Sequence, residues 1–319
     1  MSGHDIEISI IAPMYNEELN IFTTLQELSR ELGKLNKSFE IIFVNDGSTD
    51  KTLEVCEKAK KQYPNLHVVS YFPNQGRGRA LREGFKKASG KYTFTIDFDL
   101  SYDVTHITRM YQFLQENPMT DIVLVSCYMP GGQTVGVTPS RLFISKFGNK
   151  VLSHAFSPTI YTSTCVVRGY KTEVIKKILL EADDKEIHLE ILSKALALGH
   201  EVKEIPGTLT KRKAGKSNFR FKVTSLSHIV FLLIERPALH FGVIGIAFLG
   251  LSSISGLMLL LNRLFHIGFR HRLFEYISPA LVLLFLMISL FSFFFSLIGS
   301  LFTSLRREIL KIQSLILKD

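Results

Sequence analysis

The first 224 residues alternate short apolar runs with longer amphipathic segments. Runs rich in isoleucine, valine and phenylalanine predict β-strands at Glu7–Ala12, Phe39–Val44, Leu66–Tyr71, Lys91–Ile96 and Asp121–Ser126. The stretches between them carry apolar residues at helical spacing and predict helices at Asn16–Leu35, after Asp50, at Arg77–Ala88 and at Val104–Asn117. Because strands that alternate with helices usually form a parallel sheet, this pattern predicts an α/β domain with a mostly parallel sheet.

Beyond residue 224 the pattern changes to two long runs without Asp, Glu, Lys or Arg, Pro237–Asn262 and Tyr276–Leu305. About 20 apolar residues suffice for a helix to cross the bilayer core. The runs therefore predict two transmembrane helices, near 237–261 and 277–302, and the short connector makes 237–305 a hairpin. Two buried core helices are the alternative, but helices of globular proteins are about half as long.

Charge and cysteine usage suggest which side of the membrane the domain occupies. The chain has a net charge of +9, with basic residues clustered before the first span and in the tail 306–319. Because cytoplasmic segments are enriched in Lys and Arg, we expect an integral membrane protein whose domain and C-terminus are cytoplasmic, although three arginines in the connector oppose this. Three scattered cysteines without disulfide or zinc spacing fit a reducing compartment.

The segment 219–236 mixes apolar and basic residues and predicts an interfacial amphipathic helix that leads into the first span. An amphipathic helix that packs on the domain is the alternative. We attribute the positive charge to anionic lipid and substrate rather than to nucleic acid, because no nucleic-acid-binding motif occurs in the sequence.

Polar motifs follow each of the first four predicted strands: Pro13–Glu17, Asn45–Asp50, Asn74–Gly78 and Asp97–Asp99. Ligands of such sheets bind beyond the carboxyl ends of the strands, so four motifs there predict one site. No G-x-G-x-x-G follows the first strand, which disfavours a dinucleotide oxidoreductase.

The carboxylates of Asp97 and Asp99 stand two residues apart at a strand end, so they point the same way and repel each other unless a cation neutralises them. Hard divalent cations prefer such oxygen ligands and share them with substrate phosphates. The pair therefore predicts a site for Mg²⁺ or Mn²⁺, although a solvated turn is the simpler interpretation of an isolated Asp-x-Asp.

Together these motifs, read as IIAPMYNEELNI, FVNDGSTDKT, NQGRGRALREGF and IDFDLS, resemble the family 2 glycosyltransferases of GT-A fold, a Rossmann-type architecture. The domain-plus-hairpin layout is similar to that of the polyprenyl-phosphate glycosyltransferases related to dolichol-phosphate mannose synthase. Arg141 and Ser145 match the R-x-x-x-S motif of that group, and Arg212 in RKAGKS matches its R-x-x-G-x-S-K motif.

The resemblance implies inverting transfer of a hexose from a nucleotide-sugar, GDP-mannose or a UDP-hexose, to a dolichyl or undecaprenyl phosphate. It implies catalytic roles for Asp99, Arg141 and Arg212, with Asp97 and Asp99 as metal ligands. The acceptor phosphate is expected at Arg141, Ser145 and Arg168. The nucleotide-sugar is expected at Pro13, Tyr15, Asn16, Glu17, Asp46, Gly78, Arg79 and Asp97.

The sequence departs from the family pattern at Asn45, Cys127 and Asn218, which replace an aspartate, an arginine and a lysine. These departures leave a membrane-anchored inactive scaffold as the main alternative, and a lipid flippase ranks below it. Glu190 fits a solvated helix face as well as a site role, and Arg141 could instead contact lipid headgroups. The absence of tryptophan excludes the Q-x-x-R-W motif of processive polymerases. A homo-oligomer remains open.

Overall fold

A computed structural model describes residues 6–137, 142–143, 145–146, 148–150, 160–210, 236–265 and 272–316. The chain divides into two compact units, one comprising Met1–Ser227 with Leu310–Asp319 and the other His228–Ile309, and each is described by itself. Arg141, Arg212 and nearly all of the segment 219–236 lie outside the described residues.

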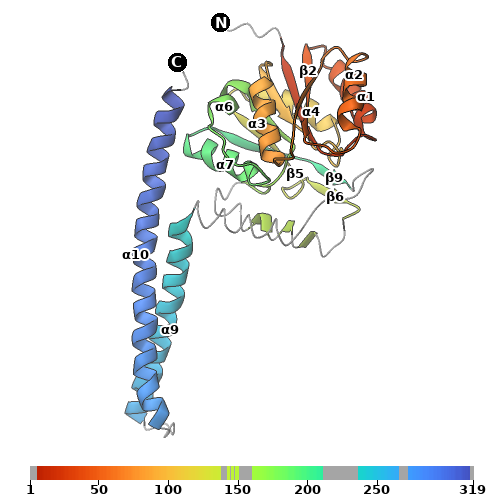
Figure 1. Ribbon diagram of the computed structural model, residues 1–319. Helices are drawn as coiled ribbons and strands as arrows, with labels where there is room; N and C mark the ends of the chain where they lie inside the picture. The colour runs from red at the N-terminus through yellow and green to blue at the C-terminus, as the bar shows by residue number, and fades with distance from the viewer. Residues whose placement is uncertain are drawn as a thin grey trace. The chain divides into compact units, whose positions relative to one another are not determined.

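The first unit is a sheet covered by helices (Figure 1). The sheet has seven strands in the order β3-β2-β1-β4-β7-β5-β8. Its strands are β1 (Ile8–Met14), β2 (Phe39–Asp46), β3 (Leu66–Tyr71), β4 (Tyr92–Thr95), β5 (Ile122–Ser126), β7 (Arg168–Lys171) and β8 (Val202–Pro206). Only β7 runs antiparallel to its neighbours, β4 and β5, which confirms the predicted mostly parallel sheet. Two short parallel strands, β6 (Gln133–Val135) and β9 (Thr208–Thr210), form a second sheet.

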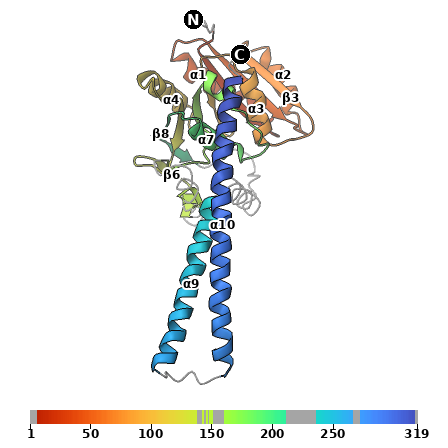
Figure 2. The ribbon, with the colours of Figure 1, turned by 90° about the vertical axis from the view of Figure 1, so that its left-hand side faces the viewer.

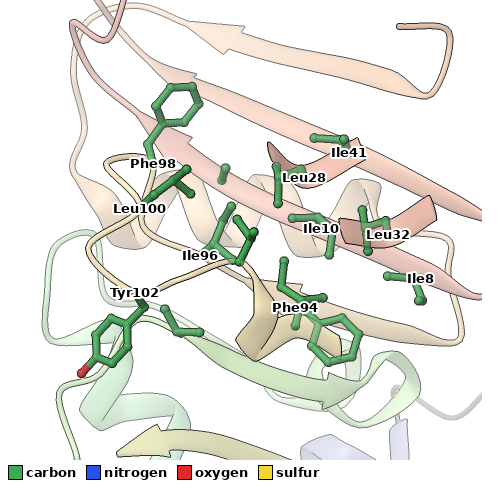
Figure 3. Close-up of a cluster of buried hydrophobic side chains, with 14 of the residues drawn as sticks. Ile8, Ile10, Leu28, Leu32, Ile41, Phe94, Ile96, Phe98, Leu100 and Tyr102 are labelled. Atoms are coloured by element: carbon green, nitrogen blue, oxygen red, sulfur yellow. The ribbon is translucent and has the colours of Figure 1, made fainter. Parts of the chain in front are cut away.

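Helices cover both faces of the large sheet, because the buried strands alternate their side chains between two apolar layers. On one face Ile8 and Ile10 lie beside Leu28 and Leu32 of α1 (Figure 3). On the other face Ile11 meets α3 so closely that a Cβ at Gly84 would lie 2.4 Å from its side chain. The helices of this unit are α1 (Ile21–Gly33), α2 (Thr52–Lys60), α3 (Arg77–Lys87), α4 (Thr105–Glu116), α6 (Thr172–Lys177) and α7 (Ile187–Ala197).

The second unit is a hairpin of α9 (Pro237–Phe265) and most of α10 (Arg272–Ile316), and the two helices lie side by side in both views (Figures 1 and 2). Pro237–Leu261 and Pro279–Leu310 are long and apolar enough to cross a membrane, and only 11% of each apolar window is buried. Core helices of a soluble protein would be mostly buried, so the exposed apolar surface favours the predicted membrane spans over that alternative.

Three serine hydroxyls join the hairpin helices by donating to backbone carbonyl oxygens of the opposite helix. Ser296 bonds to Ala238 at 2.7 Å, and Ser289 bonds to Gly245 at 2.8 Å. Ser252 bonds to Val282 at 3.0 Å in the reverse direction. Successive bonds are seven residues apart on both helices, which is the repeat of left-handed helix packing. We call these three bonds the serine ladder.

Candidate active site

The loop after β1 is fixed to the loop after β2 through Asn16 and Glu17. Asn16 has a φ of 55°, which asparagine tolerates better than most residues. Its amide oxygen accepts a bond from the Thr49 backbone N–H at 2.8 Å, and its own N–H donates to the Ser48 hydroxyl at 2.9 Å. The Glu17 N–H likewise donates to the Thr52 hydroxyl at 2.9 Å. The two predicted nucleotide-binding motifs therefore form one connected structure.

Two other predicted nucleotide-sugar residues, Pro13 and Tyr15, border this structure, and the Glu17 side chain lies within it. Pro13 lies in β1 beyond Ile11, where the β1–β4 pairing ends, so its missing N–H costs no hydrogen bond on that side. Tyr15 is exposed at the strand end. The Glu17 carboxylate is buried and accepts a bond from the Asn20 side chain at 2.6 Å.

Asp46, at the end of β2, is buried and binds the loop that leads into α3. Its carboxylate accepts bonds from the Gln75 N–H at 2.7 Å, the Gly76 N–H at 3.0 Å and the Asn74 side chain at 2.9 Å. The preceding Asn45 replaces the family aspartate, and its amide bonds to the Ser70 hydroxyl on β3. Asp46 therefore positions a site loop directly, whatever it contributes to ligand binding.

The N-terminal end of α3 lies against the loop formed by residues 180–184, which we call the α6–α7 loop. A Cβ at Gly76, where φ is 95°, or at Gly78 would lie 2.4 Å from a backbone oxygen of Asp183 or Ala182. The Arg79 N–H also donates to the Asp183 carbonyl oxygen at 3.1 Å. The glycines of the N-x-G-R-G motif thus allow the close approach of two loops, and packing is the visible role of Gly78.

Glu190 of α7 holds the α6–α7 loop by accepting hydrogen bonds from its backbone. Its buried carboxylate accepts bonds from the backbone N–H groups of Glu181 and Ala182, and from the Lys194 ammonium at 2.7 Å. Lys194 is also buried and donates to the Leu179 carbonyl oxygen at 2.6 Å. Glu190 is therefore a structural anchor beside the site, and the solvated alternative is wrong.

The acidic pair follows β4 in a tight turn. The Asp99 carboxylate accepts a bond from the Ser101 N–H at 3.0 Å, and Leu100 between them has a φ of 49°. The Asp97 carboxylate lies 3.4 Å from the guanidinium of Arg77 at the start of α3. Both aspartates are partly exposed, so the pair faces outward at the edge where the motifs gather.

β9 is attached to the acidic turn. The N–H and hydroxyl of Thr210 both donate to the Ser101 carbonyl oxygen, at 2.8 and 3.0 Å. Arg212 follows Thr210 by two residues but lies outside the described residues. The chain that carries Arg212 therefore departs from a point bonded to the acidic turn.

On the predicted acceptor side, the Tyr128 hydroxyl donates to the Ser145 hydroxyl at 2.7 Å. This bond joins Tyr128, which follows the Cys127 that replaces a family arginine, to Ser145 of the R-x-x-x-S motif. Cys127 beside Tyr128 is buried, and burial raises the pKa of its thiol above the ordinary value. An arginine side chain could not replace this thiol without displacing its neighbours.

Arg168 does not suit the acceptor contact that the sequence suggested. Its side chain is 0% exposed, and its guanidinium donates to the carbonyl oxygens of Ser163 at 2.6 Å, Cys165 at 2.7 Å and His188 at 2.9 Å. A cation with no exposed surface and three carbonyl partners has no room for a lipid phosphate. Arg168 is therefore a structural residue whose buried guanidinium joins β7 to α7 and to the segment before β7.

Comparison with known proteins shows which family the chain belongs to. The sequence profile described as Glycosyl transferase family 2 matches residues 9–179. The chain belongs to this family. It is 26% identical over 273 residues to an undecaprenyl-phosphate 4-deoxy-4-formamido-L-arabinose transferase of Shewanella sediminis, covering 81% of this chain and 76% of that protein. It is 29% identical to a dolichol-phosphate mannosyltransferase of Pyrococcus furiosus, covering 72% of this chain and 64% of that relative's length.

The fold of this family 2 glycosyltransferase is also found in solved structures. The crystal structure of glucosyl-3-phosphoglycerate synthase from Mycobacterium tuberculosis with Mn²⁺, UDP and phosphoglyceric acid has a TM-score of 0.56 and 18% identity to this chain. The similarity covers 72% of this chain and 78% of the other. At that identity it supports the GT-A fold alone, the fold that the sequence predicts.

The described residues contain no group of three or more His, Cys, Asp or Glu side chains that could hold a metal ion. Two carboxylates nevertheless fit Mg²⁺ or Mn²⁺ in a glycosyltransferase, because Mg²⁺ is commonly held by one or two carboxylates plus substrate phosphates and water. Asp97 already faces a cation, the guanidinium of Arg77. The donor set therefore fits a divalent metal that is completed by substrate oxygens.

Two residues near the acidic pair were not predicted as site residues, Arg77 and Lys185. Arg77 was visible as the arginine in N-x-G-R-G, whereas the sequence offers no local signal for Lys185. Burial lowers the pKa of Lys185; the charge of Asp184 opposes this shift and the charge of Arg77 adds to it. Lys185 and Arg77 are therefore close enough to repel each other beside the acidic turn.

Proposed function

We propose that this protein transfers a hexose from a nucleotide-sugar to a polyprenyl phosphate, with inversion at the anomeric carbon. The product is a polyprenyl-phosphate sugar for later glycosylation. The observation that carries the proposal is the combination, in one chain, of an acidic pair at the edge of a GT-A sheet with two candidate membrane spans. The names of the two polyprenyl-phosphate transferases support the acceptor class.

The acceptor in this reaction is already an anion at neutral pH, so its attacking oxygen needs little deprotonation and the site needs no dedicated general base. One phosphate oxygen forms a bond to the anomeric carbon while the bond to the diphosphate oxygen breaks, and the nucleoside diphosphate leaves. Asp97 and Asp99 would hold a divalent metal, which would supply positive charge to the leaving diphosphate.

The main task of the protein is therefore to place two anionic substrates side by side, which requires cationic groups. We propose Arg141 and Ser145 as contacts to the acceptor phosphate and Arg212 as a contact to the donor diphosphate. The motif after β1, with Glu17, and Asp46 after β2 would bind the nucleotide. Arg168 is no longer part of this set, because it is buried in the core.

We further propose that residues 1–218 form the catalytic domain and that 219–236 lies at the membrane surface. The hairpin 237–305 would anchor the domain on the cytoplasmic face, together with the basic tail 306–319. This arrangement places an enzyme for a lipid phosphate at the headgroup layer where that phosphate resides. No observation favours the inactive scaffold, since both aspartates of the acidic pair are present.

The test is a screen of nucleotide-sugars, including GDP-mannose and several UDP-hexoses, against dolichyl and undecaprenyl phosphate. The full chain is purified in detergent, and the lipid product is detected by mass spectrometry. One donor should yield a lipid heavier than the acceptor by one sugar residue. If no donor yields a lipid product with either acceptor, while nucleotide binding is intact, the proposed reaction is wrong.

A further inference from the structure

Arg77 stands at an electrostatically unfavourable position in its helix. The first turn of α3, all of it described, contains Arg77 and Arg79 and no acidic residue. Helix N-termini carry partial positive charge, so acidic residues stabilise the first turn and basic ones oppose it. The stability of α3 therefore does not explain two arginines in its first turn. An anion bound near this end of α3 would explain them, because it would attract both side chains.

The two arginines differ in what they contact. The Arg79 guanidinium pairs with Glu83 on its own helix, at 2.9 Å. The Arg77 guanidinium instead lies 3.4 Å from the Asp97 carboxylate, in the turn that follows β4. Only one of these neighbouring cations therefore faces the acidic pair.

Lys185 adds a second positive charge close to Arg77, from the start of the turn that precedes α7. The α6–α7 loop is held against α3 by a backbone bond and by the close approach at Gly76 and Gly78, so the backbones that carry the two cations stay close together. Arg77 repels Lys185, whereas the neighbouring carboxylates of Asp184 and Glu186 attract it. A polyanion that binds beside both cations would add an attraction to each of them.

We infer that Arg77 occupies the metal-binding side of Asp97 in the free protein, and that the metal and the donor diphosphate together displace it, so that its guanidinium joins Lys185 on the diphosphate. This inference rests on the proposed function, which supplies the diphosphate. A guanidinium bonded to Asp97 and a divalent cation compete for the same carboxylate. Metal binding alone is therefore weak, and metal and nucleotide bind cooperatively.

The inference is tested by titrating the full chain in detergent with Mn²⁺ and following free Mn²⁺ by electron paramagnetic resonance, with and without UDP or GDP. Removing the cation in Arg77→Gln should tighten binding of Mn²⁺ alone by about fivefold, the upper range for a partly exposed ion pair. The same variant should lose most of the gain in Mn²⁺ affinity that the nucleotide produces in the wild type. Arg77→Lys keeps the charge on a shorter side chain, so its Mn²⁺ affinity and its gain with nucleotide should lie between those of the wild type and those of Arg77→Gln.

Lys86→Gln is the matched control, because it removes a positive charge from the same helix, on an exposed side chain that pairs with Glu83 instead of Asp97. Unchanged or weaker Mn²⁺ binding in Arg77→Gln overturns the inference, as does an equal gain in Lys86→Gln, which would indicate a general charge effect. Neither titration contains a lipid acceptor or a transfer step. Failure here and failure of the proposed transfer are therefore separate results.

Discussion

The buried pair of Glu190 and Lys194 predicts that a residue outside the ligand site controls nucleotide binding. Their side chains are 5% and 3% exposed and lie 2.7 Å apart. Removing one partner of such a pair typically costs about 3–5 kcal/mol. After Glu190→Gln, Lys194 keeps the largely exposed Glu181 carboxylate at 3.0 Å, so we expect the lower end of this range. Glu190→Gln also weakens the acceptor for the Glu181 and Ala182 N–H groups, which hold the α6–α7 loop on α7. The same loop accepts the bond from the Arg79 N–H of α3, so its displacement should be felt at the N-terminal end of α3.

The measurement is a double-mutant cycle of Glu190→Gln, Lys194→Met and both together, using thermal unfolding of the full chain in detergent and the affinity for UDP and GDP. Each single change should lower stability by about 3 kcal/mol. The double variant should be more stable than the sum predicts by about 2 kcal/mol, because neither charge is then left alone. Nucleotide affinity should fall in Glu190→Gln even at temperatures where the protein is folded.

Additive effects in this cycle would refute the reasoning, since additivity means that the two charges do not depend on each other. Unchanged nucleotide affinity in a destabilised Glu190→Gln would refute the second part, the link from α7 through the loop to α3. Lys86→Gln is a suitable control, because its pair with Glu83 is exposed and should contribute little.

Three further results are expected. Asp99→Asn should nearly abolish transfer without unfolding the protein, chelation of the wild type should have the same effect, and full activity in excess chelator would exclude the metal. Arg168→Ala should lower the unfolding temperature strongly, because three carbonyl partners are left buried, with no selective rise in acceptor KM. Burial lowers the pKa of His106, and its ring accepts a bond from the Thr208 N–H. Because the unfolded chain then binds a proton at higher pH than the folded protein does, stability should fall as pH drops below about 6.5. Thermal unfolding between pH 5 and 8 should show this decline, and it should be smaller in His106→Gln.

The elements that the sequence predicted share one property: their signal is local. β1 to β5 are short apolar runs, and each lies within two residues of its predicted limits. The predicted first helix starts too early, because Asn16 and Glu17 are used in bonds to the β2 loop and α1 begins at Ile21. Hydrophobic periodicity cannot show such a bond to a distant loop.

Three features depended on contacts far apart in sequence and could not be predicted. β7 has no apolar run, since it begins with Arg168, whose charge is satisfied by carbonyl groups brought in from two other segments. Glu190 resembles a surface residue until the α6–α7 loop folds over it. The pairing of Arg77 with Asp97 joins two motifs that the sequence placed at one edge without showing which side chains meet.

The serine ladder limits how the membrane anchor can move. Its three bonds stand at a fixed spacing of seven residues, so sliding one helix past the other by a single residue breaks all of them at once. The next alignment of the same spacing is about 10 Å away along the helix axis. Sliding of one helix past the other therefore costs three interhelical hydrogen bonds together, whereas tilting or rotation of the hairpin as a unit breaks none of them.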